Sequence, residues 1–141
     1  TAALHHSIMK LLDSYGQHIH FLRDPTRGGV ASVLNEVAEL TKLGFALKQN
    51  AIPIHEQVDA ACEMLGLDPL YVANEGIFLA IVSPEIADDM IKKRHEDPLT
   101  ANAEIIGEVV TANPGKVTLK SRVGGTRIVN YLTGEQLPRI C

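Results

Sequence analysis

Apolar residues return at helical spacing in four stretches of the chain. The clearest stretch lies between Val30 and Ala38, where apolar side chains occupy positions i, i+3, i+4, i+7 and i+8 and form one continuous stripe. The same kind of spacing predicts three more helices, over residues 4–15, 58–65 and 84–94.

The ends of these helices carry local signals. Gly16 is expected to end the helix over residues 4–15 as a left-handed residue, and Gly66 is expected to stop the helix over residues 58–65, the third in chain order. Ser83 and Pro84 are typical of the N-cap and the first position of the fourth helix. The third helix should bury a single apolar face, formed by Val58, Ala61, Cys62 and Leu65.

Short apolar runs between the helices predict strands. Three of these runs precede residue 100, at residues 19–23, 45–48 and 77–82. Three more follow, over 104–110, 116–121 and up to 131, separated by turn signals at 113–115 and 124–125. We expect these last three strands to form an antiparallel meander. The whole pattern predicts an α+β fold, a mainly antiparallel sheet covered by helices, rather than a doubly wound fold.

Composition narrows the functional classes. A chain of 141 residues that is 45% apolar and 21% charged fits one globular domain. Its longest apolar run, residues 77–82, is far shorter than the roughly 20 residues that span a bilayer, so we expect no membrane segment. A net charge of −4 without a basic stripe argues against nucleic acid. The two cysteines and the lack of a secretory signal favour the cytoplasm.

The segment Asp24–Gly29 (DPTRGG) joins a predicted strand to the strongest predicted helix. Backbone N–H groups and the helix dipole favour an anion at such a junction, the glycines allow close approach, and Arg27 can contact a phosphate. The alternative is structural: Asp24 caps the helix, and the glycines only make a tight turn.

Glu75 lies directly before the most apolar predicted strand. Low-dielectric surroundings raise the pKa of a carboxyl group toward neutrality, which suits it to act as a general base. The alternative is a turn residue that faces water.

Metal binding is not predicted. Among six histidines, His18 and His20 have the i, i+2 spacing that places two rings on one face of a strand. However, neither a cysteine pair nor an HExxH motif supplies further ligands. Cys62 belongs to the stripe of a predicted helix, so we expect it to be an inert core residue.

The last eight residues, 134–141, end in a cysteine. Extended, they can reach at most about 26–29 Å, and Pro138 disfavours helix there. The thiol of Cys141 is therefore expected to be carried on a flexible arm, with Arg139 opposing the effect of the neighbouring carboxylate on its ionisation. The alternative is a frayed end without a role.

Three motifs together resemble a known family: RDPTRGG at 23–29, ANEG at 73–76 and LPRIC at 137–141. They resemble the C-terminal domain of the HypE family of hydrogenase maturation proteins, within the superfamily of aminoimidazole ribonucleotide (AIR) synthetase, selenophosphate synthetase and thiamine phosphate kinase. The resemblance covers nearly the whole chain, and the terminal PRIC is its most specific part.

The resemblance implies a reaction and roles for the residues. Cys141 would accept a carbamoyl group from HypF, and ATP would drive dehydration of the thiocarboxamide to a thiocyanate, the source of the cyanide ligands of hydrogenase iron. Glu75 would be the base that removes a proton. Arg27, Gly28 and Gly29 would line the phosphate side, and Asp24 would cap the helix or orient a magnesium-bound phosphate.

The resemblance also implies a domain organisation and partners. Residues 1–133 would form the AIR synthetase-like domain and 134–141 the flexible tail. The chain begins at Thr1 without an initiator Met, so we expect a fragment that lacks the N-terminal domain, where most of the ATP and Mg²⁺ site would lie, and that is inactive alone. The partners would be that N-terminal domain, a second HypE subunit, HypF and the HypC–HypD complex. The alternatives are a non-catalytic dimerisation or docking domain, or a domain of a related ATP-dependent synthetase.

Overall fold

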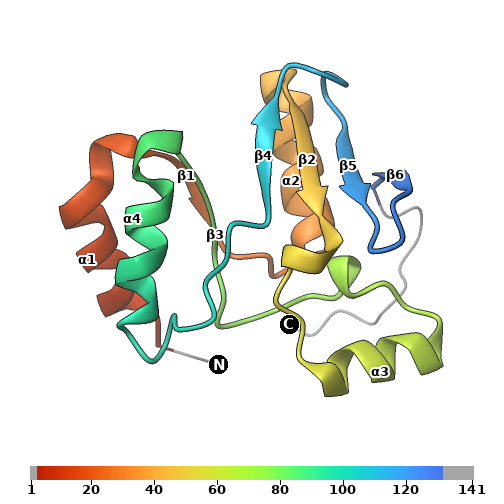
Figure 1. The fold of residues 1–141 in the computed structure, drawn as a ribbon, viewed down its shortest axis with the longest axis horizontal. Helices are drawn as coiled ribbons and strands as arrows, with labels where there is room; N and C mark the ends of the chain where they lie inside the picture. The colour runs from red at the N-terminus through yellow and green to blue at the C-terminus, as the bar shows by residue number, and fades with distance from the viewer. Residues whose placement is uncertain (1–2, 132–141) are drawn as a thin grey trace.

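A computed structural model describes residues 3–131 and arranges them as helices packed on two small sheets (Figure 1). The helices within these residues are α1 His5–Tyr15, α2 Gly29–Thr41, α3 Glu56–Leu65 and α4 Pro84–His95. The strands are β1 Ile19–Arg23, β2 Gly44–Lys48, β3 Leu79–Val82, β4 Gly107–Val110, β5 Val117–Lys120 and β6 Thr126–Val129. Short 3₁₀ turns occur at Gly16–His18 (η1), Gln49–Ala51 (η2) and Pro69–Tyr71 (η3). No helix in the described part of the chain is long and apolar enough to cross a membrane.

The larger sheet has the strand order β4-β2-β5-β6. Strand β2 is antiparallel to β4 and parallel to β5, and β5 is antiparallel to β6. The predicted α+β class with a mainly antiparallel sheet is confirmed, because every described strand pair except β2–β5 is antiparallel. Of the predicted meander of the last three strands, the antiparallel β5–β6 pair is confirmed, but the β4–β5 pair is wrong because β2 lies between β4 and β5.

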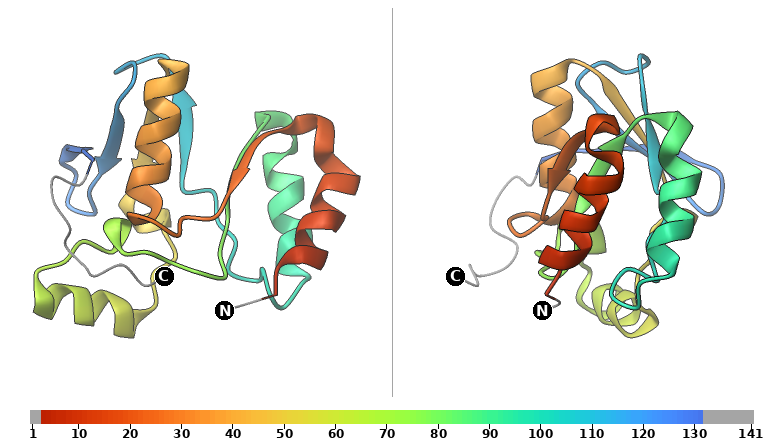
Figure 2. Two further views of the ribbon diagram at one scale, coloured as in Figure 1. Left: turned by 180° about the vertical axis from the view of Figure 1, so that it is seen from behind. Right: turned by 90° about the vertical axis from the view of Figure 1, so that its left-hand side faces the viewer.

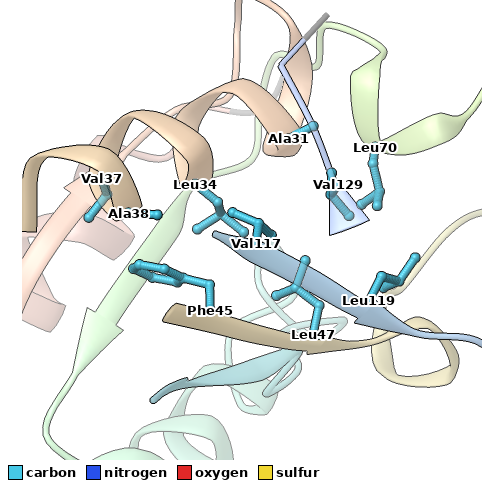
Figure 3. Packing of buried hydrophobic residues seen from close by; sticks show 10 residues of the cluster. All are labelled: Ala31, Leu34, Val37, Ala38, Phe45, Leu47, Leu70, Val117, Leu119 and Val129. Atoms are coloured by element: carbon cyan, nitrogen blue, oxygen red, sulfur yellow. The ribbon is translucent and has the colours of Figure 1, made fainter. Parts of the chain in front are cut away.

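One face of this sheet forms the main core with α2. Phe45 and Leu47 of β2 lie in register with Val117 and Leu119 of β5, so their side chains form one apolar surface. Figure 3 shows this surface meeting Leu34 and its neighbours on α2. Each large apolar side chain buried here contributes about 1.5–3 kcal/mol, which makes this layer the main source of stability.

The second sheet is the antiparallel ribbon β1–β3, which lies between the two cores. Phe21, Leu79 and Ile81 pack against the main core, whereas Ile19 and Val82 pack against a smaller core between α1 and α4. Figure 2 shows the α1–α4 pair on one side of this ribbon and α2 with the larger sheet on the other. The ribbon therefore connects the two halves of the molecule.

Of the two glycines predicted to end helices, one has the left-handed conformation of a stop signal and the other does not. Gly66 ends α3 with a left-handed φ of 66°, as a stop signal requires. Gly16 instead has a right-handed φ of −51°, so the prediction of a left-handed residue there is wrong. The chain continues from α1 into the 3₁₀ turn η1 and has no need of the left-handed conformation.

The prediction for α3 is also wrong in its burial. Of the expected apolar face only Cys62 is buried, while Val58 and Leu65 are 44% and 71% exposed. Helix α3 contacts mainly the η3 turn, and Figure 1 shows it extending along one edge of the molecule. An amphipathic pattern shows that a helix has an apolar side, but not that a neighbour covers it.

Polar contacts join the two helices of the smaller core. The hydroxyl of buried Ser7 donates a hydrogen bond of 2.5 Å to Asp97, and Arg94 donates one of 3.0 Å to the Ser7 carbonyl. The Ser7 hydroxyl and the Leu99 backbone N–H together lower the pKa of Asp97. On the same pair of helices, a hydrogen bond from Tyr15 and the charge of Lys93 lower the pKa of Asp89.

Asn35 makes the corresponding polar contact in the main core. Its amide is buried in α2 and donates to the carbonyl oxygens of Ala31 at 2.8 Å and Val129 at 2.9 Å. The second bond crosses from α2 to the edge strand β6. A single buried side chain thereby joins the helix to the last described strand.

We predict that Asn35→Ala lowers the free energy of unfolding by about 1–3 kcal/mol, because the Val129 carbonyl then loses its donor. Urea unfolding measures the loss. Asn50→Ala is the control, because Asn50 is exposed in η2 and should cost little. Equal losses in the two variants would contradict the role of the Asn35 amide.

Candidate functional site

An open pocket of about 430 Å³ lies where β1 ends and the loop before β3 begins. Its lining combines apolar side chains from α1, β1 and that loop with charged and polar groups from two loops. The lining residues are Leu4, Ile8, Leu22, Arg23, Asp24, Thr26, Glu75, Gly76, Ile77 and Phe78. The pocket thus brings together the two carboxylates that the sequence singled out, Asp24 and Glu75.

The two loops that carry these carboxylates are joined directly. Pro25 is fully buried, and its carbonyl accepts a hydrogen bond of 3.1 Å from the backbone N–H of Asn74. Asp24 and Thr26 flank Pro25, and Glu75 follows Asn74. This one backbone contact therefore holds Asp24, Thr26 and Glu75 around the same pocket.

Both carboxylates face solvent at the pocket. Asp24 and Glu75 are exposed, and neither forms an ion pair or side-chain hydrogen bond with another residue of the described range. The expected position of Glu75 ahead of the apolar strand is confirmed, since Glu75 lies in the loop that leads to β3. The residues of the described range do not bury Glu75, so they do not provide the low-dielectric surroundings expected for it.

Arg23 is a pocket residue that the sequence reasoning did not single out by itself. It is the last residue of β1, and its guanidinium forms an ion pair with Glu36 of α2. The available signal was its position directly before Asp24, the first residue of the DPTRGG segment. The ion pair joins the end of β1 to the helix that follows the pocket loop.

Arg27, Gly28 and Gly29 do not line this pocket. Helix α2 begins at Gly29, with Gly28 as its N-cap at a left-handed φ of 65° and without a side-chain cap. The alternative in which Asp24 caps the helix is therefore wrong, because Asp24 lies four positions before Gly28, which is itself the N-cap residue. Arg27 is exposed beside this turn.

Gly29 has a packing role of its own. It is buried with a φ of +63°, and a Cβ placed there would lie 2.4 Å from the Leu70 carbonyl oxygen and 2.7 Å from that of Val72. The start of α2 can therefore approach the backbone of residues 70–72 only without a side chain. The same close approach holds the chain that leads into Asn74.

The other candidates are placed as follows. His18 lies in the η1 turn rather than on the strand, so the expectation that it shares a strand face with His20 is wrong. The His20 ring is 2.9 Å from the Ser83 hydroxyl, and across residues 3–131 no cluster of three or more His, Cys, Asp or Glu side chains could hold a metal.

Cys62 is buried, as expected. Cys141 and the rest of the 134–141 segment lie outside the described residues.

A second pocket, of about 380 Å³, lies beside the end of α2 and the 113–116 turn. Partial burial and the charges of Glu39 and Glu36 raise the pKa of Tyr131 on its edge. None of the predicted site residues lines it. The first pocket is therefore the candidate functional site.

The sequence matches the family model described as AIR synthase related protein, C-terminal domain, over residues 4–120. A curated relative, carbamoyl dehydratase HypE of Rhizobium leguminosarum bv. viciae, is 50% identical over 141 residues, which are 100% of this chain and 40% of that protein. The chain thus spans about two fifths of the length of this relative.

Two similar solved structures agree with the fold. One is hydrogenase maturation protein HypE in complex with ATP, with a TM-score of 0.86 and 39% identity over 96% of this chain and 42% of that one. Another is a HypE–HypF complex, with a TM-score of 0.85 and 37% identity over 92% of this chain and 41% of that one.

We predict that Gly29→Ala destabilises the fold more than Gly66→Ala. Both glycines have a φ near +65°, so an alanine costs about 1–2 kcal/mol in backbone strain at either position. Only at Gly29 does the new methyl group also collide with backbone, because nothing lies within 4 Å of the Gly66 position. Denaturant unfolding of both variants measures the difference, and equal losses would rule out the close approach.

Proposed function

Because the chain belongs to the family of AIR synthase related protein C-terminal domains, we propose that it is the C-terminal part of a carbamoyl dehydratase of hydrogenase maturation. The observation that carries the proposal is the pocket that gathers Asp24, Thr26 and Glu75 from two motifs far apart in the sequence. Relatives with the name carbamoyl dehydratase support the choice of reaction.

The proposed acceptor is the thiol of Cys141. A HypF-type partner transfers a carbamoyl group to it, forming a thiocarboxamide, S–C(=O)–NH₂. A solved complex of a similar HypE protein with HypF supports this partner. The sulfur then carries the group to the pocket, and the HypC–HypD complex receives the product for hydrogenase iron, where it becomes the cyanide ligand.

Dehydration requires the carbamoyl oxygen to leave. Transfer of the terminal phosphoryl group of ATP to that oxygen releases ADP and converts a poor leaving group into phosphate. The nitrogen gives up one proton as the phosphorylated form becomes an imidate and a second proton as the C–O bond breaks. The products are a thiocyanate on sulfur, ADP and phosphate.

We assign the removal of a nitrogen proton to Glu75. It is a carboxylate on the pocket without a partner among the described residues, so it is available to accept a proton from a group bound there. The remainder of a longer protein would supply the apolar surroundings that residues 3–131 do not provide around Glu75.

The phosphate side of the site is assigned to the start of α2. Arg27, Gly28 and Gly29 follow directly on Thr26 of the pocket lining and lie at the positive end of the α2 dipole. Asp24, which does not cap the helix, is left with the orienting role: its carboxylate faces the pocket in which the phosphoryl group moves.

ATP and Mg²⁺ need more ligands than the described part of this chain offers. Oxygen ligands suit Mg²⁺, but the described residues hold no cluster of three or more candidate side chains. We therefore assign the metal and most of the ATP contacts to the N-terminal region of the longer relatives, and a solved relative with bound ATP supports the nucleotide. On this proposal residues 1–133 are the domain, 134–141 the arm, a second subunit completes the dimer, and the chain alone is inactive.

We predict that Cys141→Ala abolishes labelling while the fold is kept. In the full-length protein, meaning this chain preceded by the N-terminal region of its relatives, HypF, carbamoyl phosphate and ATP should add a carbamoyl group to the peptide that contains Cys141 and then remove one water. Peptide mass spectrometry follows both steps. Label on Cys62, or on no cysteine, would contradict the proposal.

For Glu75→Gln we predict that carbamoylation persists and dehydration falls by at least about a hundredfold, because an amide cannot accept the proton. Mass spectrometry of the Cys141 peptide after addition of ATP measures the ratio of the two forms. Glu104→Gln serves as the matched control, since Glu104 is exposed and does not line the pocket. Wild-type dehydration in Glu75→Gln would remove Glu75 from the reaction.

A further inference from the structure

We propose that the hydroxyl of Thr26 holds the oxygen of the carbamoyl group in the pocket and so sets the direction in which the group is bound. This inference rests on the proposed function and adds a substrate contact to it. It starts from the hydroxyl of a threonine that lines the pocket and that makes no hydrogen bond to another described residue.

Threonine hydroxyls in the packed parts of this structure are satisfied by backbone carbonyls. Thr41 donates to Val37 at 2.8 Å, Thr100 to Arg94 at 2.8 Å, and Thr118 to Phe45 at 3.2 Å. Thr26 is half-buried and lines the pocket, yet its hydroxyl has no hydrogen bond to any described residue. Its bonding capacity is therefore free for a molecule in the pocket.

The other polar side chains of the lining cannot serve the carbamoyl oxygen as well. The carboxylates of Asp24 and Glu75 only accept hydrogen bonds, so they repel a carbonyl oxygen. The Arg23 guanidinium is a charged donor, and one of its terminal nitrogens is paired with Glu36 of α2. Thr26 is the neutral donor among the side chains of the pocket.

A carbamoyl group has one end that accepts hydrogen bonds and one that donates them. When the carbamoyl oxygen accepts a hydrogen bond from Thr26, the NH₂ group is directed toward the carboxylate of Glu75. In this orientation Glu75 can accept a proton from the nitrogen. The reversed direction would place the oxygen against a carboxylate. Thr26 and Glu75 therefore form a complementary pair for this group.

The apolar part of the lining strengthens such a hydrogen bond. Ile8 of α1, its N-cap residue Leu4, and Phe78 are half-buried and line the same pocket. A hydrogen bond against apolar walls has fewer water molecules to compete with it. The contact also persists through the reaction, since a phosphoryl group placed on the oxygen presents further acceptors to Thr26.

The test compares Thr26→Val, which has the same shape without the hydroxyl, with Thr26→Ser, which keeps the hydroxyl. In single-turnover reactions of the carbamoylated full-length protein with ATP, Thr26→Val should dehydrate about tenfold to a hundredfold more slowly, as expected for one hydrogen bond to an oxygen that gains charge. Thr26→Ser should stay within about threefold of wild type. The ATP concentration for half-maximal rate should not change.

Thr118→Val is the matched control, because that hydroxyl bonds to backbone away from the pocket and its loss should not change the rate. Thr26→Ala replaces Thr26→Val as the variant without the hydroxyl if valine prevents folding, which a thermal unfolding curve will show. A wild-type rate in the variant without the hydroxyl, or an equal loss in Thr26→Ser, overturns the inference alone. Failure of the wild-type protein to dehydrate, or full dehydration by Glu75→Gln, overturns the proposed function instead.

Discussion

The arrangement of the site depends on the close approach of two backbone segments. The first turn of α2 lies against residues 70–72 because Gly29 has no side chain, and two residues later the Asn74 N–H bonds to the Pro25 carbonyl. These contacts join segments that are more than 40 residues apart in the chain. A bulkier residue at position 29 would separate the segments and, with them, Asp24 and Glu75.

Polar side chains of this protein fall into two groups with different consequences. Ser7, Asn35 and Arg94 are buried and bonded to other residues, so they contribute to the fold. Asp24, Thr26 and Glu75 lie on the pocket without such partners. Because these three side chains make no hydrogen bonds within the described structure, their hydrogen-bonding capacity is available to a bound molecule. This availability is a stronger indication of a functional site than their exposure.

The elements themselves could be predicted because their causes are local. The apolar stripe from Val30 to Ala38 forms α2, and Gly66 stops α3 because only a residue that tolerates a left-handed φ fits there. Strands β3 and β4 begin two and three residues later than predicted, because strand pairing rather than apolar character sets where a strand begins. The parallel β2–β5 pair and the exposure of α3 could not be predicted, since each depends on which surfaces meet across long stretches of chain.

The candidate site divides in the same way. The sequence by itself determined which chemical groups the candidate site has available, because the carboxylates, the arginine and the glycines of the DPTRGG and ANEG motifs have the same chemical properties wherever they stand. Only the tertiary structure decided that Asp24 and Glu75 share one pocket, that Thr26 joins them, and that Gly29 serves packing. The physical reason is that residue type follows from covalent structure, whereas proximity follows from the packing of the whole chain.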